Sequence, residues 1–230
     1  KAIWNSGAGN FNETDFGTFG VTDVLTLTAY DVKTWKNNGG DVTGGTFYYM
    51  IYPKGTRPSP TTFTSKAINF IENIGVSGDQ KWGFSGATIN VLSGLAAGEY
   101  SIEVYCAVNG TTPSSTIYDN NNNNNYIASF KVTTAPLAPS NISITPGNTQ
   151  LSVAFTPGYD GGSAITNYKY SINGGTNFIE CSPAQTTSPI VITGLTNGTS
   201  YNVQIRAMNS NGDGVATSSA AATPSTTPSV

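Results

Sequence analysis

Glycine, asparagine and proline cluster at short intervals along the whole chain, and this spacing constrains the fold more than any other feature of the sequence. The segments between the clusters are short and alternate apolar with polar residues, which is the period of a half-buried β-strand. Helical periodicity, with apolar residues three and four positions apart, is nearly absent. The sequence therefore predicts an all-β protein, and the regular spacing of the short strands favours β-sandwiches over a barrel.

The first half of the chain contains six such alternating runs. Turn signals between them include Asn-Asn-Gly-Gly at 37–40 and Ser-Gly-Asp at 77–79. Six or more short strands in a segment of this length are typical of a sandwich. The expected strands are 24–29, 47–52, 67–72, 88–92, 100–108 and 126–132.

Residues 133–139, with the sequence Thr-Thr-Ala-Pro-Leu-Ala-Pro, indicate a domain boundary. Two prolines among small residues describe an extended linker that joins no strand ladder. The tail has the same chemistry, so the chain is expected to be part of a larger multidomain surface assembly. The predicted division is a first domain over 1–134, a second over 138–223, and a linker or tail over 224–230.

The second domain contains seven short alternating runs joined by distinctive turns. Pro-Ser stands at its start, and further turn segments precede the third, sixth and last strands, at 139–140, 159–165, 194–201 and 209–212. These segments resemble bacterial fibronectin type III domains over residues 138–223. The resemblance implies a seven-stranded Greek-key sandwich of the immunoglobulin-like class. Phe155 stands where many members have a buried tryptophan, and it fills much of the same volume.

Two tyrosines are predicted to pin equivalent corners of the two domains. The resemblance implies a tyrosine corner at Tyr201, whose hydroxyl bonds back to nearby backbone. Residues 94–100, Gly-Leu-Ala-Ala-Gly-Glu-Tyr, parallel residues 194–201 with one residue fewer and end at Tyr100. We therefore expect a corner at Tyr100, and two consecutive β-sandwich domains that are both immunoglobulin-like Greek keys.

Charge and apolar content exclude several classes of partner. Charged residues are only 10% of the chain, and the net charge is −3. This balance leaves no basic face for nucleic acid or for an anionic membrane surface. No apolar stretch approaches the length that spans a bilayer. The expectation is therefore no nucleic-acid partner and no membrane insertion.

The sequence also argues against catalysis. It contains no histidine, the commonest general base, nucleophile activator and metal ligand. Cys106 and Cys181 lie in different halves with no metal-ligand spacing, and we expect buried free thiols rather than a bridge. Carboxylates such as Glu103 show no pairing in the sequence, and most are expected on solvated faces and in turns. We predict no catalytic residues, no metal-binding cluster and no enzyme activity.

The most unusual segment is a run of six asparagines, residues 120–125, flanked by tyrosines. Asparagine amides donate and accept hydrogen bonds, which suits sugar hydroxyls, and the tyrosines offer faces for stacking. A carboxylate with amide carbonyls can also hold calcium, the one candidate cofactor. The alternative is a plain hairpin loop, because asparagine tolerates left-handed backbone. The candidate ligand-binding residues here are Tyr118, Asp119, Asn120, Asn121 and Tyr126.

Two tryptophans complete the candidate site. Trp82 lies in a glycine-rich stretch beside a lysine, a suitable platform for a sugar ring. Trp35 follows the alternation of Thr26, Thr28 and Tyr30 less cleanly. A sandwich core of this size also needs one or two tryptophans. Both roles therefore stay open for Trp35 and Trp82.

The first domain carries two further resemblances. The segment 118–126 is similar to a stretch near the end of some starch-binding sandwich modules, although Tyr118 replaces their tryptophan. Other segments resemble a module of large secreted bacterial surface proteins, which implies an extracellular location at the bacterial cell surface. We expect a non-catalytic attachment module that recognises a surface glycan or protein on a fibronectin-like spacer. The alternative is that both domains are structural spacers of a stalk or filament. The segments that carry the second resemblance are 25–28, 31–39, 49–53, 78–82 and 90–95.

Overall fold

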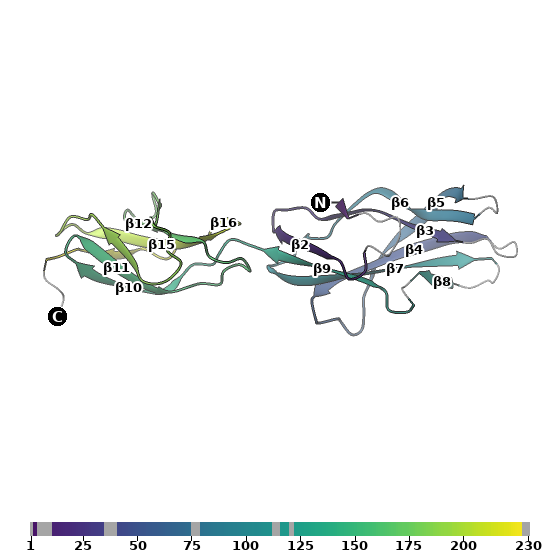
Figure 1. Cartoon of the computed structure of the whole chain (residues 1–230), viewed down its shortest axis with the longest axis horizontal. Helices are drawn as coiled ribbons and strands as arrows, with labels where there is room; N and C mark the ends of the chain where they lie inside the picture. Colours follow the sequence, from purple (N-terminus) through teal and green to yellow (C-terminus); the bar gives the residue numbers. More distant parts are fainter. Residues whose placement is uncertain are drawn as a thin grey trace. The chain divides into compact units, whose positions relative to one another are not determined.

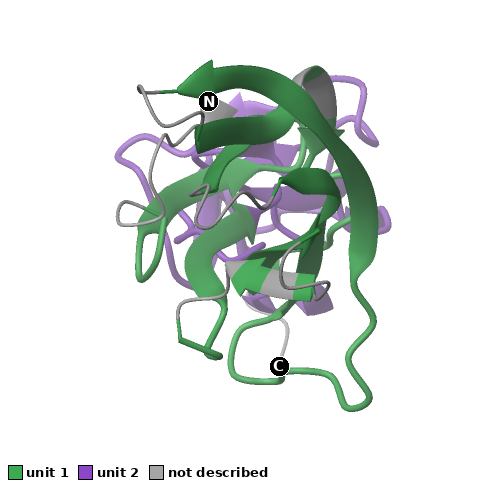
Figure 2. Cartoon of the chain, turned by 90° about the vertical axis from the view of Figure 1, so that its right-hand side faces the viewer, with its two compact units in different colours: residues 1–132 green, residues 133–230 purple. Residues whose placement is uncertain are grey.

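The structure is a computed structural model in which every regular element of the described residues is a β-strand. The chain forms two compact units, residues 1–132 and 133–230 (Figure 2). The prediction of an all-β fold with two consecutive sandwiches is confirmed. The described residues are 2–3, 11–34, 41–74, 79–111, 116–119 and 122–226.

Unit 1 is built from strands that form one continuous ladder in the order β1-β3-β6-β5-β4-β7-β9-β2, with β8 paired to β7 (Figure 1). The strands are β1 (Ala2–Ile3), β2 (Asp15–Gly20), β3 (Thr26–Thr34), β4 (Val42–Pro53), β5 (Thr64–Ile74), β6 (Asp79–Asn90), β7 (Gly98–Gly110), β8 (Thr116–Asp119) and β9 (Tyr126–Thr133).

Strand β5 joins the two layers of unit 1. Its residues 64–68 pair with β4, and its residues 69–74 pair with β6. The register shifts between Phe70 and Glu72, so that Ile71 is an extra residue. A bulge of this kind bends a strand and lets it leave one sheet for another. One layer is therefore β1-β3-β6-β5 and the other is β5-β4-β7-β9-β2, with β8 beside β7.

The core of unit 1 follows from strand alternation on β4 and β7. Phe47 is fully buried, and its ring lies 4.6 Å from that of Tyr30 and 5.4 Å from that of Phe84. On β7, Ile102 and Cys106 point into the same core at the expected period of two. Cys106 is a buried free thiol, and so is Cys181 in unit 2.

Unit 2 packs a three-stranded sheet, β10-β11-β14, against a sheet that contains β13-β12-β15-β16, with β17 also paired to β15 (Figure 1). Phe155 of β11 is buried, and its ring lies 4.8 Å from that of Tyr168. It therefore occupies the core position expected of it. The strands are β10 (Ser140–Gly147), β11 (Gln150–Thr156), β12 (Asn167–Ser171), β13 (Ile179–Glu180), β14 (Ile190–Thr193), β15 (Tyr201–Asn209), β16 (Gly212–Asp213) and β17 (Ala220–Ala222).

Segment 133–139 is not a free linker, because its backbone bonds to two other segments of unit 2. Thr134 donates its N–H to the carbonyl of Gly161, and Leu137 donates to the carbonyl of Tyr159, both at 2.9 Å. On the other side the Pro136 carbonyl accepts from Val215 at 3.2 Å. Residues 134–139 belong to no strand, as the linker prediction requires. The segment is nevertheless held by single backbone hydrogen bonds, because a proline loses only its donor and keeps its acceptor.

Tyr100 and Tyr201 both bond back to the backbone shortly before them. The Tyr100 hydroxyl donates to the carbonyl oxygen of Ala96 at 3.0 Å. The Tyr201 hydroxyl instead accepts from the N–H of Thr196, also at 3.0 Å. The two positions are alike, but the direction of the hydrogen bond is reversed.

Removing either hydroxyl should weaken the unit that contains it. Tyr100→Phe and Tyr201→Phe should each cost about 0.5–1.5 kcal/mol, because both side chains are half-buried and water can reach the released backbone groups. Urea unfolding measures the loss, with Tyr159→Phe as an exposed tyrosine control. If Tyr201→Phe destabilises unit 2 while Tyr100→Phe leaves unit 1 unchanged, the two corners are not equivalent.

Candidate functional site

The asparagine run interrupts a strand and does not close a hairpin. Strand β4 occupies one edge of β7, so β8 and β9 both lie along the other edge. β8 ends opposite Cys106, and β9 begins opposite Val104. The chain therefore has six residues, 120–125, where β7 has one, Tyr105. The hairpin interpretation is wrong, and the run is an insertion within the last strand, a larger relative of a β-bulge.

The backbone of the insertion explains part of its composition. Asn122, Asn123 and Asn125 have φ values of 55°, 70° and 55°. Among residues with a side chain, asparagine is one of the few that adopt this left-handed conformation readily. Asparagine at these three positions therefore suits the backbone that leads into β9 at Tyr126.

Three strands of the same layer each present one tyrosine on the face that points away from the core. Tyr48 of β4 lies opposite Tyr105 of β7, with ring centroids 4.6 Å apart and planes 9° apart. Tyr118 of β8 lies 6.4 Å from Tyr105, and Phe63 meets Tyr105 edge-on at 5.0 Å. Tyr118 is 56% exposed. We call Tyr48, Phe63, Tyr105 and Tyr118 the tyrosine cluster.

The same face contains a buried carboxylate, Glu103, two residues before Tyr105 on β7. Its side chain is only 1% exposed. Arg57, from the connection between β4 and β5, donates to it through Nε at 2.8 Å and through Nη2 at 2.7 Å. Tyr52 donates its hydroxyl at 3.1 Å, and Asn125 donates its amide at 2.6 Å. We call these four residues the Glu103 network. Glu103 is an exception to the expectation that most carboxylates are solvated, because Arg57 and Asn125 cover it.

Burial, the largest influence on Glu103, acts to raise its pKa, because a charged group loses hydration. The hydrogen bonds from Arg57, Asn125 and Tyr52, together with the charge of Arg57, outweigh burial, so the pKa of Glu103 lies below its ordinary value. Burial and the nearby carboxylate raise the pKa of Tyr52. Burial also raises the pKa of Tyr105, and its tyrosine neighbours add to this. At neutral pH Glu103 is therefore ionised, while Tyr52 and Tyr105 are neutral.

The lowered pKa of Glu103 predicts an acid-sensitive contribution to stability. Because the folded pKa lies below the unfolded one, the network stabilises unit 1 fully above roughly pH 5 and loses this effect as the pH falls through the folded value. Wild type and Glu103→Gln should differ most in melting temperature at neutral pH, and the difference should shrink in acid. A difference that stays constant from neutral pH to pH ~3 would contradict the ionised network.

The residues predicted to bind ligand do not share one face. Trp82 is 8% exposed and belongs to the core of unit 1, so its proposed role as a sugar platform is wrong. Its indole N–H donates to Oε1 of Gln80 at 3.2 Å. Tyr126 is half-buried and packs on the same core, in phase with Ala128 of β9, whereas Tyr118 is on the outer face. Asp119 is the last residue of β8. Trp35, Asn120 and Asn121 lie outside the described residues.

Two features are absent from the described residues of unit 1 and unit 2, a metal-binding cluster and a membrane-spanning helix. Within these ranges no three histidine, cysteine, aspartate or glutamate side chains are grouped so that they could hold a metal ion. The same residues include no helix long and apolar enough to cross a membrane. Calcium at the insertion stays a prediction from the sequence.

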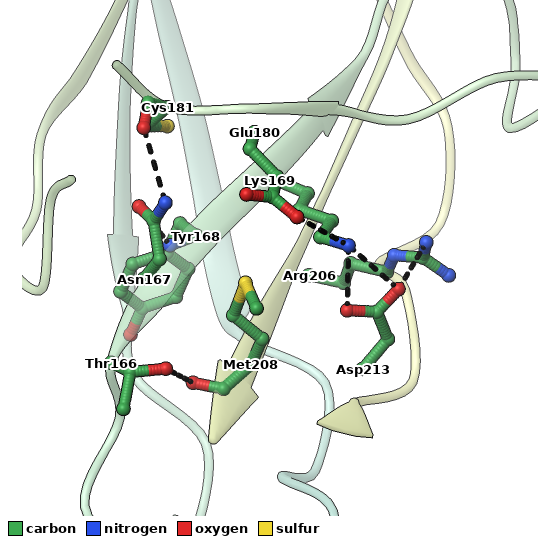
Figure 3. A network of polar contacts seen from close by, with 9 residues as sticks. All are labelled: Thr166, Asn167, Tyr168, Lys169, Glu180, Cys181, Arg206, Met208 and Asp213. Carbon is green, nitrogen blue, oxygen red and sulfur yellow. Dashed lines mark hydrogen bonds and ion pairs between the residues drawn. The ribbon is translucent and has the colours of Figure 1, made fainter. Parts of the chain in front are cut away.

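Unit 2 carries a separate ion network on its larger sheet (Figure 3). Lys169 of β12 lies 3.0 Å from carboxylate oxygens of both Glu180 and Asp213, and Arg206 of β15 also pairs with Asp213, at 2.6 Å. The Arg206 guanidinium lies 4.0 Å from the ring centre of Phe178. The hydrogen bonds to Glu180 and Asp213 raise the pKa of Lys169, which keeps the amine protonated and unsuited to act as a nucleophile. The network cross-links four strands.

Two β-sandwiches with these strand orders, antiparallel except for the β1–β3 pair, define an immunoglobulin-like all-β protein. The family model of the fibronectin type III domain matches residues 137–224. The prediction of a fibronectin type III domain over residues 138–223 is therefore confirmed. This fold is consistent with a non-catalytic extracellular spacer or recognition module.

Three solved structures are similar to the chain. Domains A168–A170 of titin are 12% identical with a TM-score of 0.40, and the match covers 93% of this chain and 62% of that one. The FN1–FN3 domains of chicken CNTN1 are 12% identical with a TM-score of 0.38, covering 94% and 69%. The FN5 domain of Drosophila Lar is 21% identical with a TM-score of 0.32, covering 40% and 98%. The chain thus spans less than two thirds of the titin fragment. No curated protein sequence matches it.

Sequence reasoning missed most of this site. Tyr48, Phe63, Tyr105 and the Arg57–Glu103 pair come from two strands and a connection, and their meeting depends on cross-strand register. One signal was available, because Ile102, Val104 and Cys106 alternate as core residues. That alternation places positions 103 and 105 together on the opposite face.

Proposed function

We propose that this chain is a non-catalytic attachment module of the bacterial cell surface, in which unit 1 recognises a neutral glycan and unit 2 is a spacer. The observation that carries the proposal is the tyrosine cluster, three cross-strand tyrosines beside an insertion of asparagines. The fibronectin type III domain and the low charge of the chain support the extracellular location. Assembly with further domains belongs to the same proposal.

The chemistry of the cluster favours an uncharged, hydroxyl-rich ligand. The exposed ring of Tyr118 offers apolar surface to a sugar ring, while tyrosine hydroxyls and asparagine amides donate and accept hydrogen bonds. Glu103 and Arg57 neutralise one another, so this pair presents no net charge to a ligand. Binding should therefore depend little on salt concentration.

A glycan array with the full chain tests the proposal. It should carry maltoheptaose, cellohexaose and chitohexaose as neutral glycans and heparin as a charged one. We expect binding to a neutral glycan, and Tyr118→Ala should weaken it roughly tenfold or more with little change in melting temperature. Tyr159→Ala, at a tyrosine of unit 2 that is 53% exposed, is the control. If wild type binds no neutral glycan, the structural-spacer alternative takes its place.

A further inference from the structure

One carboxylate ties together three segments of unit 1 that are far apart in sequence. Oε1 of Glu103 accepts hydrogen bonds from Arg57 and from Asn125, and Oε2 accepts from Arg57 and from Tyr52. Arg57 belongs to the β4–β5 connection, and Asn125 belongs to the insertion between β8 and β9. These segments approach β7 from its two opposite edges. Glu103 is therefore the point at which the connection and the insertion are held to the same strand.

The two segments that Glu103 holds are those that border the tyrosine cluster. The β4–β5 connection also carries Phe63, whose ring packs edge-on against Tyr105. The insertion separates Tyr118 from Tyr126 and stands opposite Tyr105. A shift of either segment would thus change the surroundings of the cluster. Rigid support from a buried polar group is what a precise binding surface requires.

We propose that Glu103 is a positioning residue for glycan recognition, an inference that rests on the proposed function of the cluster. Glu103 fixes the insertion and the β4–β5 connection in the arrangement that receives the ligand. Because its side chain is 1% exposed, it acts through Asn125 and Arg57 and not by touching the ligand. Because each oxygen already accepts two hydrogen bonds, the carboxylate leaves no capacity to bind a cationic group. Glu103 is therefore not a site for a cationic ligand group.

The test compares Glu103→Gln with Glu99→Gln in the full chain. Both residues lie on the same face of β7, because side chains at every second position of a strand share a face. Glu99, however, is 60% exposed and its ion pair with Lys54 is a long one, at 3.7 Å. Amide exchange is measured over residues 122–127, and affinity is measured for maltoheptaose and cellohexaose. Glu103→Gln should speed exchange roughly tenfold and weaken binding by a similar factor. Glu99→Gln should stay within about twofold of wild type in both.

A second variant keeps the test decisive if Glu103→Gln folds poorly. Asn125→Gly removes the amide donor, and glycine accepts the φ of 55° at this position. It should reproduce the loss of affinity, and the double variant should bind no more weakly than either single one, because all act through one contact. Additive losses, or Glu103→Gln behaving as wild type in exchange and binding, would overturn the positioning role. If wild type binds neither oligosaccharide while amide exchange still rises in Glu103→Gln, the proposed glycan recognition fails. In that case the result still shows that Glu103 holds residues 122–127 in place.

Discussion

Replacing Trp82 with alanine should destabilise unit 1 by about 3–5 kcal/mol. The indole is buried in the core, edge-on to Phe70 at 5.8 Å, and its N–H is hydrogen-bonded to Gln80. Truncation removes this large apolar surface from the core and leaves a cavity that the sheets can only partly close. Domains of this size are stable by only ~5–15 kcal/mol, so the loss is a large fraction of the total. Urea unfolding followed by tryptophan fluorescence reports it, because all three tryptophans lie in unit 1.

The matched variants separate the core role of Trp82 from a binding role. Trp82→Phe keeps much of the volume and should cost less than half as much as alanine. Tyr118→Ala removes an exposed ring of the tyrosine cluster and should change stability by less than about 0.5 kcal/mol. A Trp82→Ala protein that is as stable as wild type but binds no glycan would contradict the core role of Trp82. It would mean that Trp82, and not Tyr118, is the main aromatic contact of the glycan.

The fold class followed from the sequence because its causes are local. Alternation with a period of two and turn residues such as those at 159–165 and 194–201 identify strands and a fibronectin type III domain without any long-range information. Strand β5 shows the limit of this reasoning. Its move from one sheet to the other depends on a one-residue bulge at Ile71, and a β-branched residue within an alternating run gives no sign of it.

The candidate site was harder to predict because it depends on register between distant strands. Trp82 lies beside glycines, which suggested exposure, yet Gly83 is where β6 approaches the backbone of Tyr30 too closely for any side chain. The insertion looked like a hairpin because β8 is only four residues long and pairs with β7 beyond the end of β9. Glu103 could not be told apart from the other carboxylates because the sequence does not show that Arg57, in the β4–β5 connection, reaches it.

A second large loss of stability is expected in unit 2, where replacing Asn209 with alanine should cost about 2–4 kcal/mol. Asn209 is 4% exposed at the end of β15. Its amide donates to the carbonyls of Thr134 and Asp160 at 2.8 Å and to that of Ser163 at 3.3 Å, and its Oδ1 accepts from the N–H of Asn211. Alanine takes the side-chain donor from the Asp160 and Ser163 carbonyls and the acceptor from the Asn211 N–H, while the Thr134 carbonyl keeps a second donor, Nδ2 of Asn211 at 3.2 Å. Each buried group left unsatisfied costs about 1–3 kcal/mol.

The same variant tests whether segment 133–139 is part of the folded unit 2. Asn202→Ala, an exposed asparagine on the same strand, is the control and should cost less than about 0.5 kcal/mol. Gly161→Ala should also destabilise unit 2, because Gly161 has a φ of 73° and an added Cβ would collide with the Thr134 carbonyl. Circular dichroism should show both losses, while the tryptophan signal of unit 1 should not move. Both changes act on the Thr134 carbonyl, since Asn209→Ala removes one of its donors and Gly161→Ala collides with it. The double variant should therefore lose less than the sum of the two, and a fully additive loss would mean that the segment is not held at a shared contact.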